Sequence, residues 1–219
     1  MNHDSTSSAA SGFPLAHHFD DQEQQFEASQ LGMWLFLATE VLFFGGMFAA
    51  YTIYRYQYPA AFHAASQHLN VTVGAINTAV LLLSSLMMAL AVHYAQLGDN
   101  RRAFRFILET ILFGGMFLAV KAYEYQHKFH EHLVPGDHFQ WHGGETKGVE
   151  IFFSLYFAMT GMHALHMVIG VGLLLWVAWL ARQERFSSQY FTPVEMVGLY
   201  WHFVDIVWVF LFPLLYLIG

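Results

Sequence analysis

Residues 35–46 read Leu-Phe-Leu-Ala-Thr-Glu-Val-Leu-Phe-Phe-Gly-Gly and place one carboxylate inside an otherwise apolar run. The run continues over residues 31–54, which is long enough for a helix to cross about 30 Å of hydrocarbon at about 1.5 Å per residue. Glu40 falls near the middle of that length, where a charged side chain costs roughly 2.5 to 3.5 kcal/mol or more. The stretch therefore predicts a membrane-spanning helix whose carboxyl group faces the protein interior.

Four further stretches are as long and as apolar, at residues 71–96, 104–123, 149–181 and 194–218. The whole chain is 56% hydrophobic and only 11% charged, against about 25% charged in soluble domains. Backbone groups in lipid must be satisfied within each segment, so these runs are expected to be helices. The sequence thus predicts an all-α, polytopic bundle of five transmembrane helices over residues 31–219, after a polar N-terminal segment of residues 1–30. Loops are expected near residues 55–70, 97–103, 124–148 and 182–193.

Charge and cysteine content exclude several classes of function. The formal net charge is −7, and no basic stripe exists that would neutralise the phosphates of a nucleic acid. The absence of cysteine excludes thiolate metal sites and disulfides.

Basic residues near the ends of the predicted spans indicate how the chain crosses the membrane. Two compact groups fall in short loops on one side, and they comprise Arg101, Arg102, Arg105, Arg182 and Arg185. Positive residues favour the cytoplasmic side, which predicts a cytoplasmic N-terminus and an external C-terminus. The same five arginines are candidates for binding anionic lipid headgroups, although the orientation rule by itself accounts for most of the cluster.

Polar residues inside the spans are the candidate functional residues. His163 and His166 lie three residues apart on one predicted helix, His202 and Asp205 lie three apart on another, and Glu124 follows the third span. The histidines are candidate ligands of a metal or haem, but a His-x-x-His pair supplies few of the ligands that a redox site needs. A proton relay through the bilayer is a second interpretation, which the unmatched depths of these groups disfavour.

Interhelical hydrogen bonding is the favoured interpretation of these polar residues. Glu40 is then a buried carboxyl that either donates a hydrogen bond in its neutral form or forms an ion pair with a neighbouring histidine. Similar depth makes His202 and Asp205 the expected partners of Glu40.

Several strings together resemble subunit III of cytochrome c oxidase. They are Thr-Glu-Val-Leu-Phe-Phe-Gly-Gly (39–46), Asn-Thr (77–78), Tyr-Glu-Tyr (123–125), Thr-Gly-Met-His-Ala-Leu-His-Met-Val-Ile-Gly (160–170) and Tyr-Trp-His-Phe-Val-Asp-Ile-Val-Trp (200–208), in the order that the family has them. Many members have seven helices, and the five predicted here match the last five. Subunit III of quinol oxidases also has five, but that branch carries Asp at the position of Glu40 and Phe at that of Tyr200, so the residues favour the cytochrome c branch. A subunit III-like protein that accompanies nitric oxide reductase is less similar.

The resemblance implies an accessory subunit without a redox centre of its own, in a bacterial cytoplasmic (inner) membrane. Haem and copper would belong to subunits I and II, which reduce oxygen and pump protons. The third subunit packs on subunit I, supports proton uptake, binds phospholipid, protects the core during turnover and has been proposed as an oxygen entry route; membership of a respiratory supercomplex is a further expectation. Glu40 matches the carbodiimide-reactive carboxyl of the family, whereas the absence of two helices removes one wall of the lipid cleft. An independent redox or transport protein using His93, His163, His166 and His202 is the alternative from another class.

Overall fold

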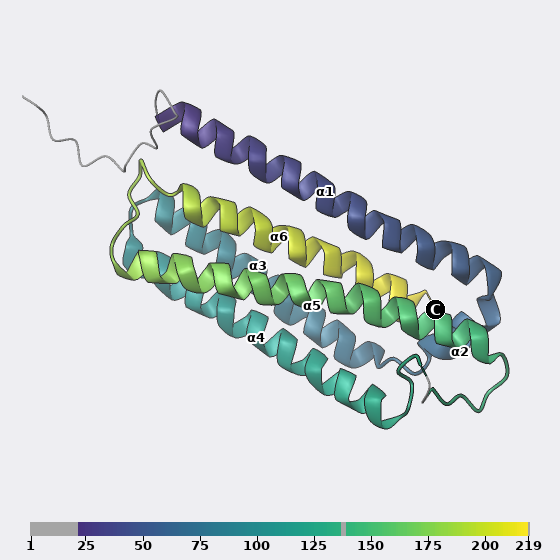
Figure 1. The fold of residues 1–219 in the computed structure, drawn as a ribbon. Helices are drawn as coiled ribbons and strands as arrows, with labels where there is room; N and C mark the ends of the chain where they lie inside the picture. Colours follow the sequence, from purple (N-terminus) through teal and green to yellow (C-terminus); the bar gives the residue numbers. More distant parts are fainter. Residues whose placement is uncertain (1–21, 137–138, 219) are drawn as a thin grey trace, which may run out of the picture.

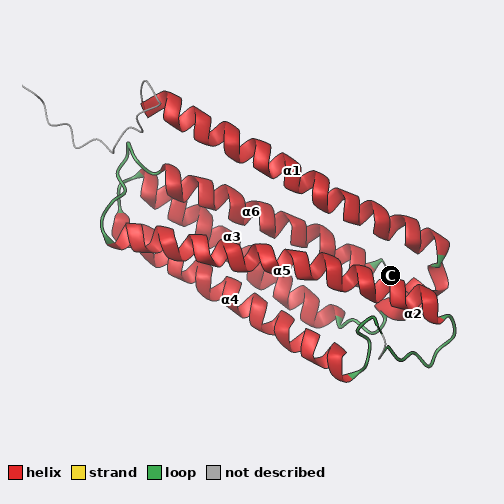
Figure 2. Ribbon diagram, viewed as in Figure 1, coloured by secondary structure: helices red, strands yellow, loops and turns green. Residues whose placement is uncertain are grey.

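The computed structural model describes residues 22–136 and 139–218, and within them it is helical with loops between the helices (Figure 2). The helices are α1 (Gln22–Gln57), α2 (Pro59–Ser66), α3 (Val71–Gln96), α4 (Asn100–His130), α5 (Thr146–Arg182) and α6 (Thr192–Phe212), and the chain ends in a π-helical turn, η1 (Pro213–Leu217). In the described residues, α1, α3, α4, α5 and α6 (continued by η1) are each long and apolar enough to cross a membrane. The prediction of an all-α bundle with five transmembrane helices is confirmed.

The bounds of the elements differ from the prediction at most helix ends, and most clearly in α1, α4 and the region of α2. α1 begins at Gln22, inside the predicted polar segment of residues 1–30, while residues 1–21 of that segment lie outside the described residues. α4 extends past both ends of the predicted span. A helix can continue outside the hydrocarbon, where polar side chains contact water. The prediction of a loop over residues 55–70 is wrong in part, since α2 lies there with Pro59 in its first turn, where the missing N–H costs nothing.

The long helices pack as an antiparallel group with α1 along one flank (Figure 1). α3 and α4 form a closely packed hairpin, and α5 and α6 complete a four-helix core. α1 contacts α5 and α6 but is the least buried of the five spans, whereas α6 is the most buried. The polar side chains of α6 are therefore expected to meet protein, and much of α1 is open to lipid or to another subunit.

The α3–α4 turn fixes one end of the bundle. Gly98 has a φ of +75°, a conformation that side chains disfavour, and Asp99 caps α4 by accepting a hydrogen bond from the backbone N–H of Arg102 at 3.0 Å. Asn100 then holds the α5–α6 loop through two hydrogen bonds with the backbone of Phe186, at 2.7 and 3.0 Å. This end of the bundle consequently carries all five arginines of the two predicted groups.

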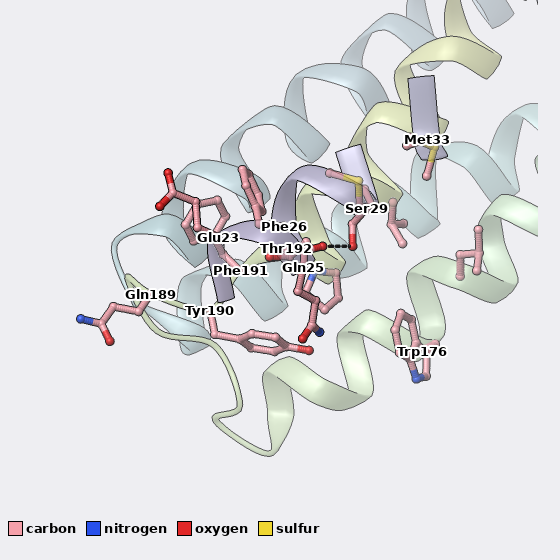
Figure 3. Close-up of a pocket in the computed structure, with 14 residues that line it drawn as sticks. Glu23, Gln25, Phe26, Ser29, Met33, Trp176, Gln189, Tyr190, Phe191 and Thr192 are labelled. Carbon is pink, nitrogen blue, oxygen red and sulfur yellow. Dashed lines mark hydrogen bonds between the residues drawn. The ribbon is translucent and has the colours of Figure 1, made fainter. Parts of the chain in front are cut away.

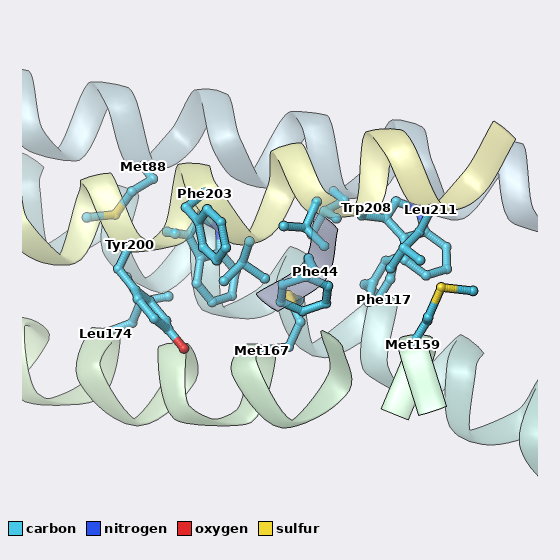
Figure 4. Close-up of a cluster of buried hydrophobic side chains, with 14 of the residues drawn as sticks. Phe44, Met88, Phe117, Met159, Met167, Leu174, Tyr200, Phe203, Trp208 and Leu211 are labelled. Atoms are coloured by element: carbon cyan, nitrogen blue, oxygen red, sulfur yellow. The ribbon is translucent and has the colours of Figure 1, made fainter. Parts of the chain in front are cut away.

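The core of the bundle is built around Trp201 of α6. Its ring lies against two glycines, and a Cβ would lie only 2.8 Å from the ring at Gly114 of α4 and 2.9 Å from it at Gly170 of α5. The indole N–H donates to the Ser84 hydroxyl at 3.2 Å, and Ser84 donates to the carbonyl of Thr110 at 2.9 Å. Figure 4 shows the apolar side chains that continue this layer between α5 and α6. Two glycines therefore let three helices close around one large aromatic side chain.

Candidate functional site

Glu40 of α1 meets His166 of α5 in the interior-facing side of the bundle. The carboxyl Oε2 lies 3.2 Å from the imidazole Nε2, and the other ring nitrogen, Nδ1, lies 2.8 Å from the carbonyl oxygen of Met162. The side chains of Glu40 and His166 are 19% and 10% exposed, so the pair is largely buried. Glu40 is thus an interhelical bridge, as its position in the span predicted.

The hydrogen bonds of His166 determine how many protons the pair holds. A carbonyl oxygen can only accept, so Nδ1 carries a hydrogen and donates it to Met162. The contact between Nε2 and the carboxyl then requires one more proton, carried either by Glu40 or by the imidazole. Both arrangements leave Glu40 and His166 together without net charge, which is how a carboxyl is tolerated at this depth.

Aromatic rings enclose the Glu40–His166 pair. The His166 ring lies edge-on to Phe44 at 5.4 Å and parallel to Tyr200 at 6.4 Å, measured between ring centroids. The Tyr200 hydroxyl donates to the His166 carbonyl at 3.1 Å, and Phe36 stacks on the Tyr200 ring at 6.1 Å. Phe44 and Tyr200 are both seen beside α5 in Figure 4. These contacts tie α1 to α5 and α6 at the level of Glu40.

The expected partners of Glu40 are wrong. His202 faces α3 instead, where its Nδ1 lies 2.7 Å from the Ser85 hydroxyl. Asp205 is 2% exposed and lies near Ser85, and neither of its carboxyl oxygens makes a hydrogen bond of normal geometry within the described residues. The expectation used depth alone, and the rotation of α6 points His202 toward α3.

His163 does not join His166 in a common site. Its ring is 1% exposed and lies between Phe117 and Trp208, at 5.6 and 5.1 Å, and neither ring nitrogen has a hydrogen-bond partner among the described residues. His166 is committed to Glu40 and Met162, and His202 is committed to Ser85. In the part of the chain that the structure describes, no group of three or more His, Cys, Asp or Glu side chains is arranged to hold a metal ion.

Glu124 belongs to a second buried polar cluster, which joins α4, α5 and the C-terminal turn. Lys121 is 5% exposed, and its ammonium donates to Glu124 at 3.1 Å, to the Tyr156 hydroxyl at 3.1 Å and to the Tyr216 hydroxyl at 2.9 Å. Both tyrosines in turn donate to Glu124, at 2.7 and 2.5 Å. All three ammonium donors are therefore used. The ammonium also lies 5.1 Å from the Trp208 ring, a distance typical of cation–π contacts.

Glu124 was predicted from the sequence as a candidate residue, but its partners Lys121, Tyr156 and Tyr216 were not. A signal was present, because Lys121 and Glu124 are opposite charges three residues apart within an apolar helix, a spacing that puts them on one face. The predicted span ends at residue 123, so Lys121 falls in its last residues, where a charge near the membrane surface is common. The tyrosines come from other helices, and their position depends on the packing of α5 and η1 against α4.

A cavity of about 810 Å³ opens between the start of α1, the end of α5 and the start of α6 (Figure 3). The polar residues that line it include Glu23, Gln25 and Gln189, and the apolar ones include Trp176 and Met196. Tyr190 also lines it, and burial raises the pKa of that hydroxyl, so it remains neutral. A lining with both polar and apolar side chains suits an amphiphilic molecule.

Of the five predicted arginines, two line a pocket and three do not. Arg102 and Arg105 line a small pocket with Tyr94, Phe106 and Glu109. Arg101, Arg182 and Arg185 do not line it.

Comparison with known proteins identifies the family of the chain. The sequence profile of the family described as cytochrome c oxidase subunit III matches residues 16–219. A protein of Thermostichus vulcanus named cytochrome c oxidase subunit 3 is 35% identical over 196 residues, 86% of each chain, and one of Synechocystis sp. with the same name is 33% identical over 219 residues, which cover 100% of this chain and 85% of the relative. Quinol oxidase subunit 3 of Bacillus spizizenii is 28% identical over 189 residues, 86% of each chain. The chain belongs to the cytochrome c oxidase subunit III family.

Proposed function

We propose that the chain is an accessory, non-redox subunit of a cytochrome c oxidase in aerobic respiration. In this assignment it packs on subunit I, stabilises the catalytic core, supports proton uptake and binds phospholipid. The observation that carries the proposal is the use of the polar groups in the spans: Glu40, His166, Glu124 and Lys121 are spent on interhelical contacts and do not converge on a cofactor. Such a chain contributes structure and proton-binding groups to a reaction carried out elsewhere.

The partners in this proposal are subunits I and II, which carry the haem and copper, and phospholipid of the surrounding membrane. α1 leaves much of its apolar surface unburied, including Leu31, Leu35 and Leu42, which are 63%, 61% and 76% exposed. This surface fits lipid or the apolar side of another subunit. The cavity between α1, α5 and α6 has polar and apolar lining residues, which fit the polar head and acyl chain of a phospholipid.

The proposed orientation puts the N-terminus in the cytoplasm and the C-terminus outside, in a bacterial inner membrane. The five arginines gather at the end where α1 begins, α3 meets α4 and α5 meets α6, and the positive-inside rule supports a cytoplasmic assignment for that end. Association of the oxidase with a respiratory supercomplex is part of the same proposal.

The Glu40–His166 pair is proposed to serve proton uptake and stability together. One proton is shared between a carboxyl and an imidazole, and its position can change without altering the charge of the pair. A carboxyl of this kind is also the proposed target of a hydrophobic carbodiimide. Neighbouring rings of Phe44 and Tyr200 hold the pair together and keep bulk water away from it.

Glu40→Ala is expected to leave the haem spectrum of the oxidase unchanged and to reduce its number of turnovers before inactivation several-fold, or to slow proton uptake. The reason is that the haems lie in other subunits, whereas α1 loses its polar bridge to α5. Optical spectra and progress curves of oxygen consumption would measure both effects.

Glu40→Gln provides the matched control. An amide can still donate to Nε2 of His166, but it cannot exchange a proton. We expect this variant to keep the working life of the oxidase and to show slower proton uptake. Loss of the haem spectrum in Glu40→Ala, or a working life and proton uptake equal to the parent's, would contradict the assigned role.

A quinol oxidase is the second candidate complex, because relatives named quinol oxidase subunit 3 match the chain over 86% of its length. Glu40 and Tyr200 favour the cytochrome c branch. Oxygen consumption by the purified complex with reduced cytochrome c, compared with a ubiquinol or menaquinol, would decide between the two donors.

A further inference from the structure

A small pocket of about 150 Å³ lies where α3 ends and α4 begins, separate from the cavity beside α1. It is lined by Tyr94, Arg102, Arg105, Phe106 and Glu109. Its volume suits one small polar group, such as a phosphate, more than a whole lipid molecule. Two of its five lining residues are cations.

Arg102 has two contacts within the chain, although its side chain is 61% exposed. Its Nε lies 3.4 Å from a carboxylate oxygen of Asp99, and its guanidinium carbon lies 5.2 Å from the centre of the Tyr94 ring. Tyr94 is itself stacked on Phe106, with ring centroids 5.3 Å apart and planes only 5° from parallel. A guanidinium supported by a carboxylate and an aromatic face loses less freedom when it binds an anion.

Arg105 supplies charge that the chain does not balance. It lies three residues after Arg102 and so shares a face of α4 with it. Within the described residues Arg105 has no hydrogen bond or ion pair, and it is exposed. Glu109 lies a turn deeper, about 6 Å further along the axis, without an ion pair to Arg105. An anion in this pocket would lie toward the two arginines and away from the Glu109 carboxylate, because like charges repel.

Exposed apolar side chains lie beside the pocket and suit the acyl chain of a membrane lipid. Leu108 and Leu112 follow Arg105 at intervals of three and four residues and are 43% and 61% exposed. An acyl chain can run over these leucines while its phosphate stays at the arginines. A freely diffusing phosphate gains nothing from that apolar track.

We propose that Arg102 and Arg105 bind the phosphate of an anionic phospholipid in the groove between α3 and α4. This inference rests on the lipid binding proposed above and names the lipid class and the residues that select it. Of the five arginines at this end of the bundle, Arg102 and Arg105 bind the phosphate, whereas Arg101, Arg182 and Arg185 lie outside the pocket and serve orientation.

Lipid retention by the oxidase complex tests the site. The complex containing the full chain is purified in mild detergent, depleted of exchangeable lipid and titrated with phosphatidylglycerol or phosphatidylcholine, and bound lipid is counted by native mass spectrometry. In Arg102→Gln/Arg105→Gln, affinity for one phosphatidylglycerol is expected to fall about thirtyfold, since two cations near an anionic headgroup are lost. Arg101→Gln/Arg185→Gln removes the same charge outside the pocket and should leave that affinity unchanged. Glu109→Gln, which removes the one negative charge among the residues that line the pocket, should strengthen retention.

Several outcomes would overturn the site. They are equal retention of phosphatidylglycerol by the pocket variant and the parent, equal loss in the Arg101→Gln/Arg185→Gln control, or retention of phosphatidylcholine as tight as that of phosphatidylglycerol. Displacement of the bound phosphatidylglycerol by millimolar inorganic phosphate would assign the pocket to a free anion and refute a lipid. In all these cases an assembled, active complex leaves the proposed function standing, whereas failure of the chain to assemble with oxidase subunits would overturn that function instead.

Discussion

Lys121→Met is expected to destabilise the folded chain by about 3 to 5 kcal/mol, because it leaves a buried carboxylate without its cation. Glu124 is surrounded by Lys121, Tyr156 and Tyr216, and no other cation donates to it within the described residues. The variant also removes one of the two hydrogen bonds that tie α4 to the C-terminal turn through Tyr216, and the bond from Tyr216 to Glu124 stays. Thermal unfolding of the purified complex in detergent, followed by loss of assembled subunit, would measure the change.

Lys147→Met is the matched control for that substitution, because Lys147 is exposed and removal of its charge affects no buried partner. It should change the unfolding temperature little. Lys121→Met/Glu124→Leu removes both charges and should lose less stability than the sum of its single variants, since neither ion is then left unpaired. Equal unfolding temperatures for Lys121→Met and Lys147→Met would refute the buried ion pair.

Gly114→Leu and Gly170→Leu are each expected to cost upward of about 3 kcal/mol, at the top of the range for overpacked cores. A first side-chain atom at either position would lie 2.8 or 2.9 Å from the ring of Trp201. That ring is fully buried and hydrogen-bonded to Ser84, so it cannot move aside without loss of packing on three helices. The amount of chain assembled in membranes and its unfolding temperature would report the effect.

Gly115→Leu and Gly172→Leu test whether the position of the glycine is the cause. Both glycines lie in the same two helices, and a Cβ at either meets no atom within 4 Å. These variants should assemble as well as the parent chain. A similar loss in all four variants would contradict the close packing of Trp201.

The sequence predicted the spans well because their length and composition are imposed by the bilayer. Its bounds for α4 were too short, since Arg101 and Lys128 lie outside the apolar run but continue the helix. α2 was missed because eight residues that follow a proline carry no signal that separates a short helix from a loop. Helix ends outside the hydrocarbon are set by capping groups such as Asn70 and Asp99, which hydropathy does not reveal.

The sequence identified most of the polar residues of the candidate site, but it predicted only part of the contacts between them. Glu40 was correctly expected to bridge helices, yet its partner is His166 and not His202 or Asp205. The position of a residue along its helix gives its approximate depth in the membrane. Which helices are neighbours, and how each helix is rotated about its axis, depends on packing around side chains such as Trp201. The same limit applies to Glu124, whose tyrosine partners come from α5 and from the turn after α6.

The central claim is that this chain is part of an oxidase and contains no redox centre itself. The most direct test is affinity purification of the tagged full chain from aerobic membranes, followed by its separation from the complex and measurement of the haem spectrum and metal content of each fraction. We predict that the chain brings haem- and copper-containing subunits with it, that the separated chain is colourless and free of metal, and that the remaining complex keeps the whole haem spectrum. A chain that purifies without oxidase subunits, or that shows a Soret band or bound metal after separation, would contradict the claim.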